Sequence, residues 1–346
     1  METLTSEKIN RKIMDMHCDT IGYLCGTCGS NPLAEGDNLR KNHIHLDLEK
    51  MLKSGYSLQT FAMFIDQKSM PDPFGTTLKM ISYYNKEMKT NEDIIGPVLK
   101  YTDLLENEAQ GKMSGLLSIE GGEAICGSLD KLHEVYDKGV RLMTLTWNYV
   151  NELGHPNVLT KADGTTDSIS RNPLGLTPVG IEVVQEMERI GMIVDTSHLS
   201  DGGFWDVYKN TKKPFVASHS NAAAVRNVSR NLTDDMIKAL AERGGVTGLN
   251  FCEWFLGEGW SEVPEESAKQ QLQAMVEHVK YIADKGGIEI CALGTDFDGI
   301  DESMAIPDAS YMERLLDALK KGGFTESQLD AFCHGNVRRV LKEILV

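Results

Sequence analysis

Eight short apolar runs recur along the 346 residues, and longer segments with helical periodicity separate most of them. The runs lie near residues 12–16, 57–64, 114–119, 140–145, 191–195, 214–218, 245–250 and 289–294. Such alternation is typical of a parallel sheet, because each parallel connection needs a long crossover. Eight units predict an α/β fold, the (β/α)8 TIM barrel, built as one domain that spans residues 1–346.

Helix boundary signals support this assignment. Thr177-Pro178 matches an N-cap followed by a first-turn proline, while Gly244-Gly245 and Gly286-Gly287 end helices just before apolar runs. Beyond about residue 305 the pattern adds further helices, the last of them over 325–345. We expect these extra C-terminal helices to pack outside the barrel.

Charge and composition narrow the choice of partner. The formal net charge of −16 argues against nucleic acid or an anionic membrane, because like charges repel. Residues 1–12 are polar, and no apolar run approaches the roughly 18 residues of a membrane span. Seven irregularly spaced cysteines fit reduced thiols better than a disulfide framework. These features predict a cytoplasmic protein that acts on a small, diffusible molecule.

Histidines and acidic residues directly follow five of the eight runs. In this barrel the active site lies at the carboxyl ends of the strands, so these side chains should converge there. If these histidines and acidic residues were ordinary solvated side chains, they should occur equally often on helices and in the loops at the amino-terminal ends of the strands. The six residues are His17, Asp19, Glu120, His198, His219 and Asp296.

Imidazole and carboxylate ligands together favour a borderline divalent ion such as Zn²⁺. Six residues exceed the usual three protein ligands of one catalytic ion, which predicts a site for two zinc ions per chain. His17 and Asp19 would hold one ion. His198 and His219 would hold the other, and Glu120 would span both.

Two ions about 3.5–4 Å apart can share a water and lower its pKa enough to give a bridging hydroxide near neutral pH. Asp296 is the predicted proton carrier between that water and a leaving group. Asp298 lies two residues further on and competes for this role. The pattern therefore predicts a barrel of the metal-dependent hydrolase type.

Other potential ligands have weaker contexts. Cys25 and Cys28 form a C-x-x-C pair without a second pair or a thioredoxin-like setting, so a functional role is not expected. His43 and His45 precede the second run instead of following a strand, which favours a loop or helix entry. Four further histidines lie in helical or loop contexts and are expected to be structural or exposed: His133, His155, His278 and His334.

The ordered set of motifs resembles the membrane (renal) dipeptidase family of zinc peptidases, specifically its soluble bacterial-type members. The resemblance rests on residues 14–19, 118–121, 195–198, 218–221 and 294–299, in that order and separation. It implies the barrel, a dinuclear zinc site, hydrolysis of dipeptides that can include a C-terminal D-residue, and a homodimer. It also implies that Arg230 grips the substrate carboxylate, a role that suits a planar and permanently charged guanidinium.

One departure from the family pattern concerns the fourth run. The family commonly has a substrate-contacting histidine there, whereas this chain has Trp147 followed by Asn148. The indole offers only an N–H donor, so Asn148 is the expected polar contact, and both residues are predicted to bind substrate. Two alternatives stay open: another amidohydrolase, such as a deaminase, lactonase or phosphotriesterase, or a catalytically silent binding homologue. The first commonly has H-x-H after strand one and a lysine after strand four, whereas here the first run is followed by His17-Cys18-Asp19 and the fourth has no lysine.

Overall fold

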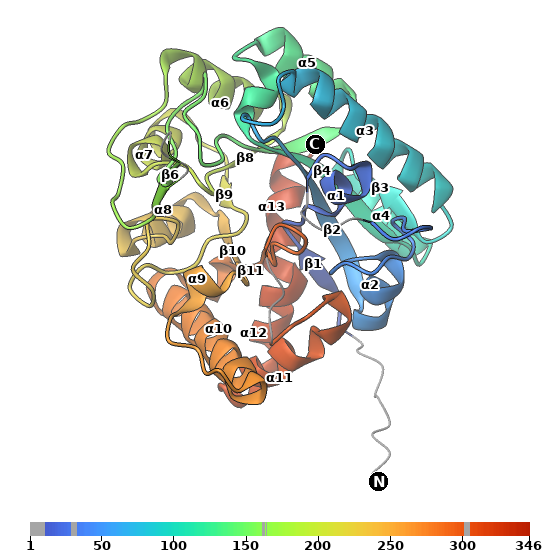
Figure 1. Ribbon diagram of the computed structural model, residues 1–346, viewed down its shortest axis with the longest axis vertical. Coiled ribbons are helices and arrows are strands. Elements are labelled where there is room, and N and C mark those ends of the chain that lie inside the picture. Colours follow the sequence, from blue (N-terminus) through green and yellow to red (C-terminus); the bar gives the residue numbers. More distant parts are fainter. Residues whose placement is uncertain (1–10, 29–32, 161–162, 164, 301–304) are drawn as a thin grey trace.

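The computed structural model describes residues 11–28, 33–160, 163, 165–300 and 305–346. Eight parallel strands pair in a closed ring, in the order β1-β2-β4-β5-β8-β9-β10-β11 and back to β1. The predicted (β/α)8 barrel is therefore confirmed, and Figure 1 shows the helices arranged around the ring. The strands are β1 (Ile13–Asp15), β2 (Tyr56–Phe64), β4 (Met113–Glu120), β5 (Val140–Thr144), β8 (Ile193–Asp195), β9 (Val216–Ala217), β10 (Val246–Leu249) and β11 (Cys291–Leu293).

Helices connect and extend the ring. Thr177 caps one of them through its side chain, with Pro178 at the first position, as predicted. Gly244 ends another with a left-handed φ of 71°. The helices are α1 (Thr20–Cys25), α2 (Leu48–Ser54), α3 (Pro73–Thr90), α4 (Tyr101–Ala109), α5 (Leu129–Asp137), α6 (Pro178–Ile190), α7 (Asp201–Asn210), α8 (Asp234–Arg243), α9 (Glu253–Leu256), α10 (Pro264–Gly286), α11 (Glu313–Lys321), α12 (Glu326–Asp330) and α13 (Asn336–Ile344).

Several short elements differ from the sequence prediction. A 3-10 helix, Ile288–Ile290, separates α10 from β11, so that strand begins later than residue 289. β3 (Ile95–Pro97) pairs with the start of β4. It lies along the same edge of β4 that pairs with β5 nearer the carboxyl end. Two-residue strands β6 (Leu159–Thr160) and β7 (Thr166–Asp167) form a separate antiparallel pair. Runs this short carry no detectable periodicity, which is why the sequence did not reveal them. The remaining short helices are Gly122–Ile125, Ala309–Tyr311 and the π-helix Ala331–Gly335.

The last helix corrects the expectation for the C-terminal tail. Apolar residues of α13, spaced as Val337, Val340, Leu341 and Ile344, pack against the inward-facing residues of the barrel strands. These strand residues are Met14, Leu58, Leu116, Leu142, Ile193, Val216, Val246 and Ala292. α13 therefore closes the amino-terminal end of the barrel instead of packing on its outer wall.

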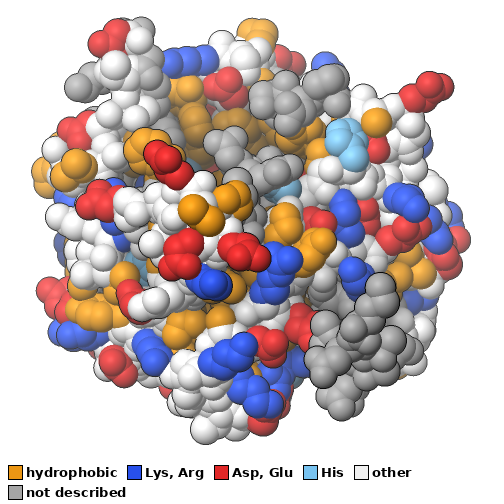
Figure 2. Space-filling model, turned by 60° about the horizontal axis from the view of Figure 1, so that its bottom comes forward, with side chains coloured by type: hydrophobic (Ala, Val, Ile, Leu, Met, Phe, Trp, Pro, Cys, Tyr) orange, Lys and Arg blue, Asp and Glu red, His pale blue; other side chains and the backbone are white. Residues whose placement is uncertain are grey.

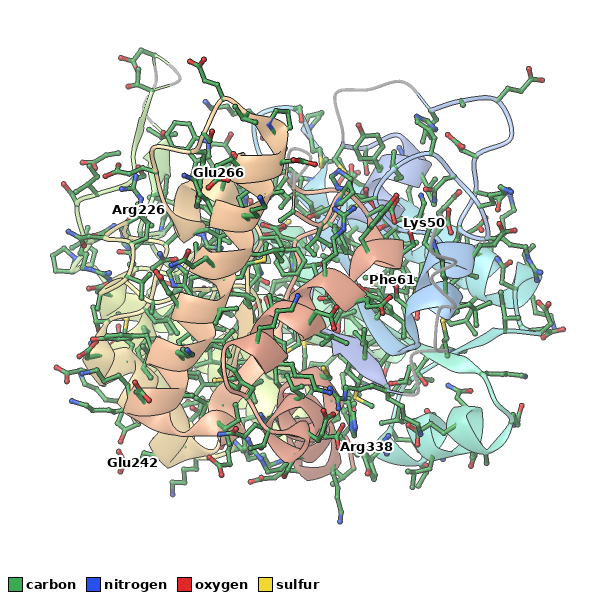
Figure 3. All side chains as sticks on the ribbon, turned by 90° about the horizontal axis from the view of Figure 1, so that it is seen from below. Lys50, Phe61, Arg226, Glu242, Glu266 and Arg338 are labelled. Carbon is green, nitrogen blue, oxygen red and sulfur yellow. The ribbon has the colours of Figure 1, made fainter. Side chains whose placement is uncertain are left out.

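The two ends of the barrel consequently differ: α13 covers the amino-terminal end, and the carboxyl-terminal end is left uncovered by this helix. Figure 3 shows the molecule from the side, with Arg338 of α13 towards one end and Lys50 and Arg226 towards the other. A second and larger apolar core fills the layer between the strands and the outer helices, where Phe61 of β2 meets Tyr84 of α3. With the amino-terminal end filled by side chains, the carboxyl ends of the strands remain available for a site.

Candidate metal and substrate site

The six predicted side chains converge at the carboxyl ends of β1, β4, β8, β9 and β11. His17 Nε2 lies 3.4 Å from Asp19 Oδ2, 3.5 Å from Glu120 Oε2 and 3.7 Å from Asp296 Oδ1. All four side chains are buried. Three carboxylates thus surround one imidazole in a region that water reaches poorly.

Glu120 joins this group to the other two histidines. Its Oε2 atom faces His17, whereas its Oε1 atom lies 3.0 Å from His198 Nε2 and 3.5 Å from His219 Nε2. The two Nε2 atoms are 3.0 Å apart. One carboxylate therefore offers one oxygen to each half of the site, which is the arrangement of a ligand shared by two cations.

The electrostatics of the group favour a bound cation. Burial lowers the pKa of His17, but the carboxylates of Glu120 and Asp19 outweigh burial and raise it well above 6.5. Burial raises the pKa of Glu120 to about 7, against the lowering effect of His17. Within the described part of the chain, neither ring nitrogen of His17 nor Asp19 Oδ1 has a hydrogen-bond partner. Buried polar atoms of this kind cost free energy unless satisfied. A divalent ion fits this donor set.

Hydrogen bonds fix which nitrogen of His219 faces the site. Ser218 Oγ donates its single proton to Asp195 Oδ2 at 2.6 Å, and the same Oγ lies 2.7 Å from His219 Nδ1. Burial lowers the pKa of His219 well below 6.5, so the ring is neutral and carries one proton. That proton lies on Nδ1 and is donated to Ser218, which leaves the Nε2 lone pair directed at Glu120.

Asn148 holds the Nδ1 atom of His198, as Ser218 holds that of His219. His198 Nδ1 donates to Asn148 Oδ1 at 2.9 Å, which directs the Nε2 lone pair towards Glu120. Burial also lowers the pKa of His198 well below 6.5. Trp147 lies with its ring centroid 6.2 Å from that of His198 and is half-buried. Both residues predicted to bind substrate thus lie at the site, and Asn148 has a positioning contact that the sequence analysis did not foresee.

Arg230 lies beside the histidines and is buried. Its guanidinium donates to Ser220 Oγ at 3.1 Å and to the His219 carbonyl at 3.2 Å. Within the described residues its Nε has no partner. A cavity between the β8 and β9 connections is lined by Arg230, His198 and Asn157, among others. The structure therefore brings a guanidinium with an unused donor to the edge of the ligand cluster.

The two competing aspartates have different surroundings. Asp296 accepts a hydrogen bond from Asn250 Nδ2 at Oδ2, 2.9 Å, and directs Oδ1 towards His17. Asp298 is occupied elsewhere, because its oxygens accept from Thr20 Oγ1 at 2.6 Å and from the His45 amide at 2.7 Å. Only Asp296 turns a carboxylate oxygen towards the ligand cluster.

Backbone strain concentrates at the same place. Three of the four described non-glycine residues with positive φ are His198, Asp296 and Asp298, at 66°, 65° and 66°. A left-handed conformation is unfavourable for residues with a Cβ and persists where surrounding contacts enforce it. Each of these residues follows a barrel strand within five positions, so the strained turns lie at the carboxyl ends of β8 and β11.

Among the described residues, none of the weaker candidates belongs to the ligand groups, although Cys28 Sγ lies 3.9 Å from the Asp19 carbonyl oxygen and His45 contacts Asp298. Cys25 and Cys28 are free thiols, and burial raises both pKa values, which opposes redox reactivity. His43 and His45 lie in the loop before α2, as expected. His278 has a structural role: its Nδ1 accepts from the Ala222 amide and its Nε2 lies 3.1 Å from the Leu256 carbonyl.

The remaining histidines and the surface also have ordinary surroundings. His133 pairs with Glu186 and His155 contacts the Gly175 carbonyl, while His334 is half-buried in the π-helix. Acidic and basic side chains are interspersed over the face shown in Figure 2. Across the described residues no helix is both long and apolar enough to span a bilayer. Residues 1–10, which carry most of the polar N-terminal segment, lie outside the described residues.

Three supporting residues escaped the sequence analysis. Asp15 accepts from the His17 amide and from the amide and hydroxyl of Thr295, which ties β1 to β11. Asp195 ties β8 to β9 in the same way, and Asn250 holds Asp296. A signal was present for Asn250, because it is the last residue of the seventh predicted run and directly follows β10. Asp15 and Asp195 each end a strand shortly before a histidine, a repetition that could have revealed them.

Comparisons with known proteins agree with this geometry. A sequence model of the membrane dipeptidase family, peptidase family M19, matches residues 6–345. An uncharacterized dipeptidase of Schizosaccharomyces pombe is 31% identical over 352 residues, covering 96% of this chain and 80% of that protein.

Two solved structures are similar throughout. The dipeptidase AC, a metallopeptidase of family M19, has a TM-score of 0.82 and 27% identity, covering 98% of this chain and 99% of its own. A metallopeptidase from Rhodobacter sphaeroides, bound to a phosphinate mimic of the dipeptide L-Ala-D-Ala, has a TM-score of 0.81 and 27% identity, with 96% and 99% covered. With a family match over nearly its whole length, the chain belongs to the membrane dipeptidase family, peptidase family M19.

Proposed function

We propose that this protein is a zinc-dependent dipeptidase with two ions per chain, which hydrolyses the peptide bond of dipeptides. The observation that carries the proposal is the position of Glu120, whose two carboxylate oxygens face His17 on one side and His198 with His219 on the other. Membership of the metallopeptidase family M19 supports the activity. The mixed imidazole and carboxylate donors support zinc.

The ligand roles follow from the two halves of the cluster. His17, Asp19 and Glu120 would hold one zinc ion, and Glu120, His198 and His219 would hold the other. When bound, the ions would supply Lewis acidity for the scissile carbonyl and for the attacking water. The protein prepares its ligands beforehand, because Ser218 and Asn148 hold the two neutral histidines with their Nε2 lone pairs inward.

Two residues outside the ligand set act on substrate. Arg230 binds the C-terminal carboxylate of the dipeptide, for which its unused Nε–H is a ready donor. Asp296 takes a proton from the attacking water at Oδ1 and passes it to the leaving amine, while Asn250 holds Oδ2. Burial raises the pKa of Asp296, against the lowering effect of His17, so the carboxyl is suited to hold a proton during the reaction.

The position of Arg230 also bears on which configuration, L or D, the C-terminal residue of the substrate can have. Arg230 recognises the terminal carboxylate, a group that L- and D-residues share, so this contact does not by itself select the C-terminal configuration. The relative from Rhodobacter sphaeroides binds a mimic of L-Ala-D-Ala, which supports tolerance of a C-terminal D-residue. The homodimer and the cytoplasmic location expected from the sequence remain predictions.

The experiment is metal analysis combined with hydrolysis. Purified protein is assayed for metal content and for cleavage of L-Ala-L-Ala and L-Ala-D-Ala, before and after treatment with a chelator and after zinc is restored. About two zinc ions per chain, with cleavage that is lost and recovered, is the expected result. Two bound ions without cleavage of any dipeptide in a broad panel would favour the silent binding homologue. Cleavage that survives complete metal removal would overturn the proposal.

A further inference from the structure

Three aromatic side chains form a continuous wall beside the ligand cluster. Trp147 meets Phe64 edge-on with ring centroids 4.8 Å apart, and it meets Tyr149 at 5.3 Å. Its own ring lies 6.2 Å from the ring of His198. All three aromatic residues are half-buried, and Lys68 Nζ lies 5.5 Å from the centroid of the Tyr149 ring. We call Phe64, Trp147 and Tyr149 the aromatic wall.

The aromatic wall occupies a definite place in the ring of strands. Phe64 is the last residue of β2 and pairs in register with Glu120, the last residue of β4. Trp147 follows β5, the next strand of the ring. Arg230, in contrast, is attached to the end of β9 through the His219 carbonyl. β2 and β9 are four places apart in a ring of eight, so Phe64 and Arg230 lie on opposite sides of the site.

This placement determines how a dipeptide lies in the site. If its carboxylate is bound by Arg230 and its carbonyl reaches Glu120 and the histidines, its N-terminal residue extends towards the opposite side. Successive Cα atoms are about 3.8 Å apart, so the N-terminal residue of the dipeptide lies one such step beyond the scissile carbonyl, away from Arg230. Its side chain then meets the aromatic wall. The C-terminal side chain starts next to Arg230, on the side of the ring opposite Phe64.

We infer that the aromatic wall binds the N-terminal side chain of the substrate and selects dipeptides in which that side chain is large and apolar, above all aromatic. Ring-to-ring contacts in offset or edge-on geometry add to the gain from burying apolar area. Trp147 contributes most, because it contacts both other rings and its own ring lies 6.2 Å from that of the predicted ligand His198. This inference rests on the proposed dipeptidase activity.

The test compares two substrate series on the zinc-loaded full-length enzyme. In the first, the N-terminal residue varies over Gly-Ala, Leu-Ala and Phe-Ala; in the second, the C-terminal residue varies over Ala-Gly, Ala-Leu and Ala-Phe. The quantity measured is the ratio of kcat/KM for Phe-Ala to that for Gly-Ala. The expected wild-type ratio is well above one, with a much smaller spread in the second series.

Substitutions then assign the preference to the wall. Trp147→Ala should lower the Phe-Ala to Gly-Ala ratio by about threefold to tenfold, the contribution of one aromatic contact. Phe64→Leu, which preserves most of the volume, should lower the same ratio, and Trp147→Phe should retain most of it. Trp254→Ala is the matched control, because the Trp254 side chain is exposed and lies outside the wall. The ratio for this control should match the wild type.

The outcomes separate the inference from the proposed function. Cleavage of dipeptides with no preference for a large N-terminal side chain would overturn the inference and leave the dipeptidase activity standing. A ratio that stays constant in both Trp147→Ala and Phe64→Leu would also overturn it, because the preference would then arise elsewhere. Failure to cleave any dipeptide in either series, with zinc bound, would overturn the proposed function and the inference with it.

Discussion

Asp195→Asn is the substitution that tests how the protein prepares its histidine ligands. The Asp195 carboxylate is buried and accepts four hydrogen bonds: from the amides of Ser197 and Ser218 at 3.0 and 2.8 Å, and from the hydroxyls of Thr144 and Ser218 at 2.5 and 2.6 Å. An asparagine has nearly the same shape. It keeps the two amide contacts at Oδ1 but places an N–H₂ group opposite the two hydroxyls.

The substitution reverses the direction of the hydrogen bonds that lead to His219. In the wild type, Ser218 donates to Asp195 and accepts from His219 Nδ1. With an amide at position 195, Ser218 accepts from the amide and its own proton is free to point at Nδ1. The proton of the neutral imidazole then moves to Nε2, the atom that faces Glu120. A protonated Nε2 cannot bind a metal ion.

Two magnitudes follow from this geometry. Loss of an oriented partner behind a metal-bound histidine costs about tenfold to a hundredfold in metal affinity. Replacing two hydrogen bonds to a carboxylate with bonds to a neutral amide should also destabilise the metal-free protein, by about 1.5–3 kcal/mol for each charged hydrogen bond lost. Both effects are measurable, and only the first is specific to the tautomer.

The assay therefore measures metal affinity and stability separately. Zinc binding is followed in metal-buffered solution, and stability is followed by urea unfolding of the metal-free protein. Asp15→Asn is the matched control, because Asp15 is equally buried and also accepts two amides and one hydroxyl at the end of a strand. In the part of the chain that the structure describes, no hydrogen bond of Asp15 leads to a histidine Nδ1. We expect both variants to lose stability, and only Asp195→Asn to lose affinity at the site containing His219.

Unaltered zinc affinity in Asp195→Asn would refute the tautomer argument, whatever happens to stability. An equal loss of affinity in Asp15→Asn would also refute it, because a general loosening of the strand ends would then explain both variants. A protein variant that carries Ser218→Ala in addition to Asp195→Asn refines the test. Without the serine hydroxyl, the amide at position 195 has no route to His219, so the double variant should bind zinc better than Asp195→Asn alone.

Three further predictions concern other parts of the molecule. Burial raises the pKa of Glu123 from 4.5 to about 7, so between these values the folded protein holds a proton that the unfolded chain has lost, and stability falls as pH rises through that window. Glu123→Gln should therefore be more stable than the wild type by about 1–3 kcal/mol at pH 8 but not at pH 4, as measured by urea unfolding; no gain at pH 8 would contradict the assignment. Leu341→Ala, in the helix that closes the barrel, should cost about 2–5 kcal/mol in unfolding free energy, whereas exposed Lys342→Ala should change it by less than about 0.5 kcal/mol. Arg230→Lys should raise KM about tenfold or more with a smaller change in kcat, because an ammonium cannot form the planar fork that grips a carboxylate; an unchanged KM would remove the carboxylate role.

The barrel and the ligand cluster could be predicted from the sequence because they depend on local patterns. Each of the eight strands is a short apolar run, and a residue at the end of such a run has only one place to go in a parallel barrel. His17 and Glu120 therefore converge as expected, although the runs that carry them are about a hundred residues apart. The family resemblance was needed for Arg230, since nothing local distinguishes it from a surface arginine.

Features that depend on tertiary packing could not be predicted in this way. The periodicity of α13 shows that one face is apolar, but it does not tell which surface that face covers. Asp296 is preferred to Asp298 as the proton carrier in the sequence analysis, but no local pattern separates them, because both follow the same strand and both are buried. Contacts from Thr20 and His45, contributed by the first connection of the barrel, occupy Asp298 and leave Asp296 facing the site.

The supporting aspartates explain how very short strands can hold a precise site. β1, β8, β9 and β11 have only three, three, two and three residues, so few backbone hydrogen bonds fix their ends. Asp15 joins the ends of β1 and β11, and Asp195 joins the ends of β8 and β9. Glu120, in contrast, ends an eight-residue strand that is paired along both edges, and among the described residues no such carboxylate ties the end of this strand to its neighbours. Side-chain carboxylates thus replace backbone pairing where a histidine follows a short strand. For that reason, substitutions at both Asp15 and Asp195 should lower the free energy of unfolding, whereas only Asp195→Asn, which alters the hydrogen bonds behind His219, should also weaken zinc binding.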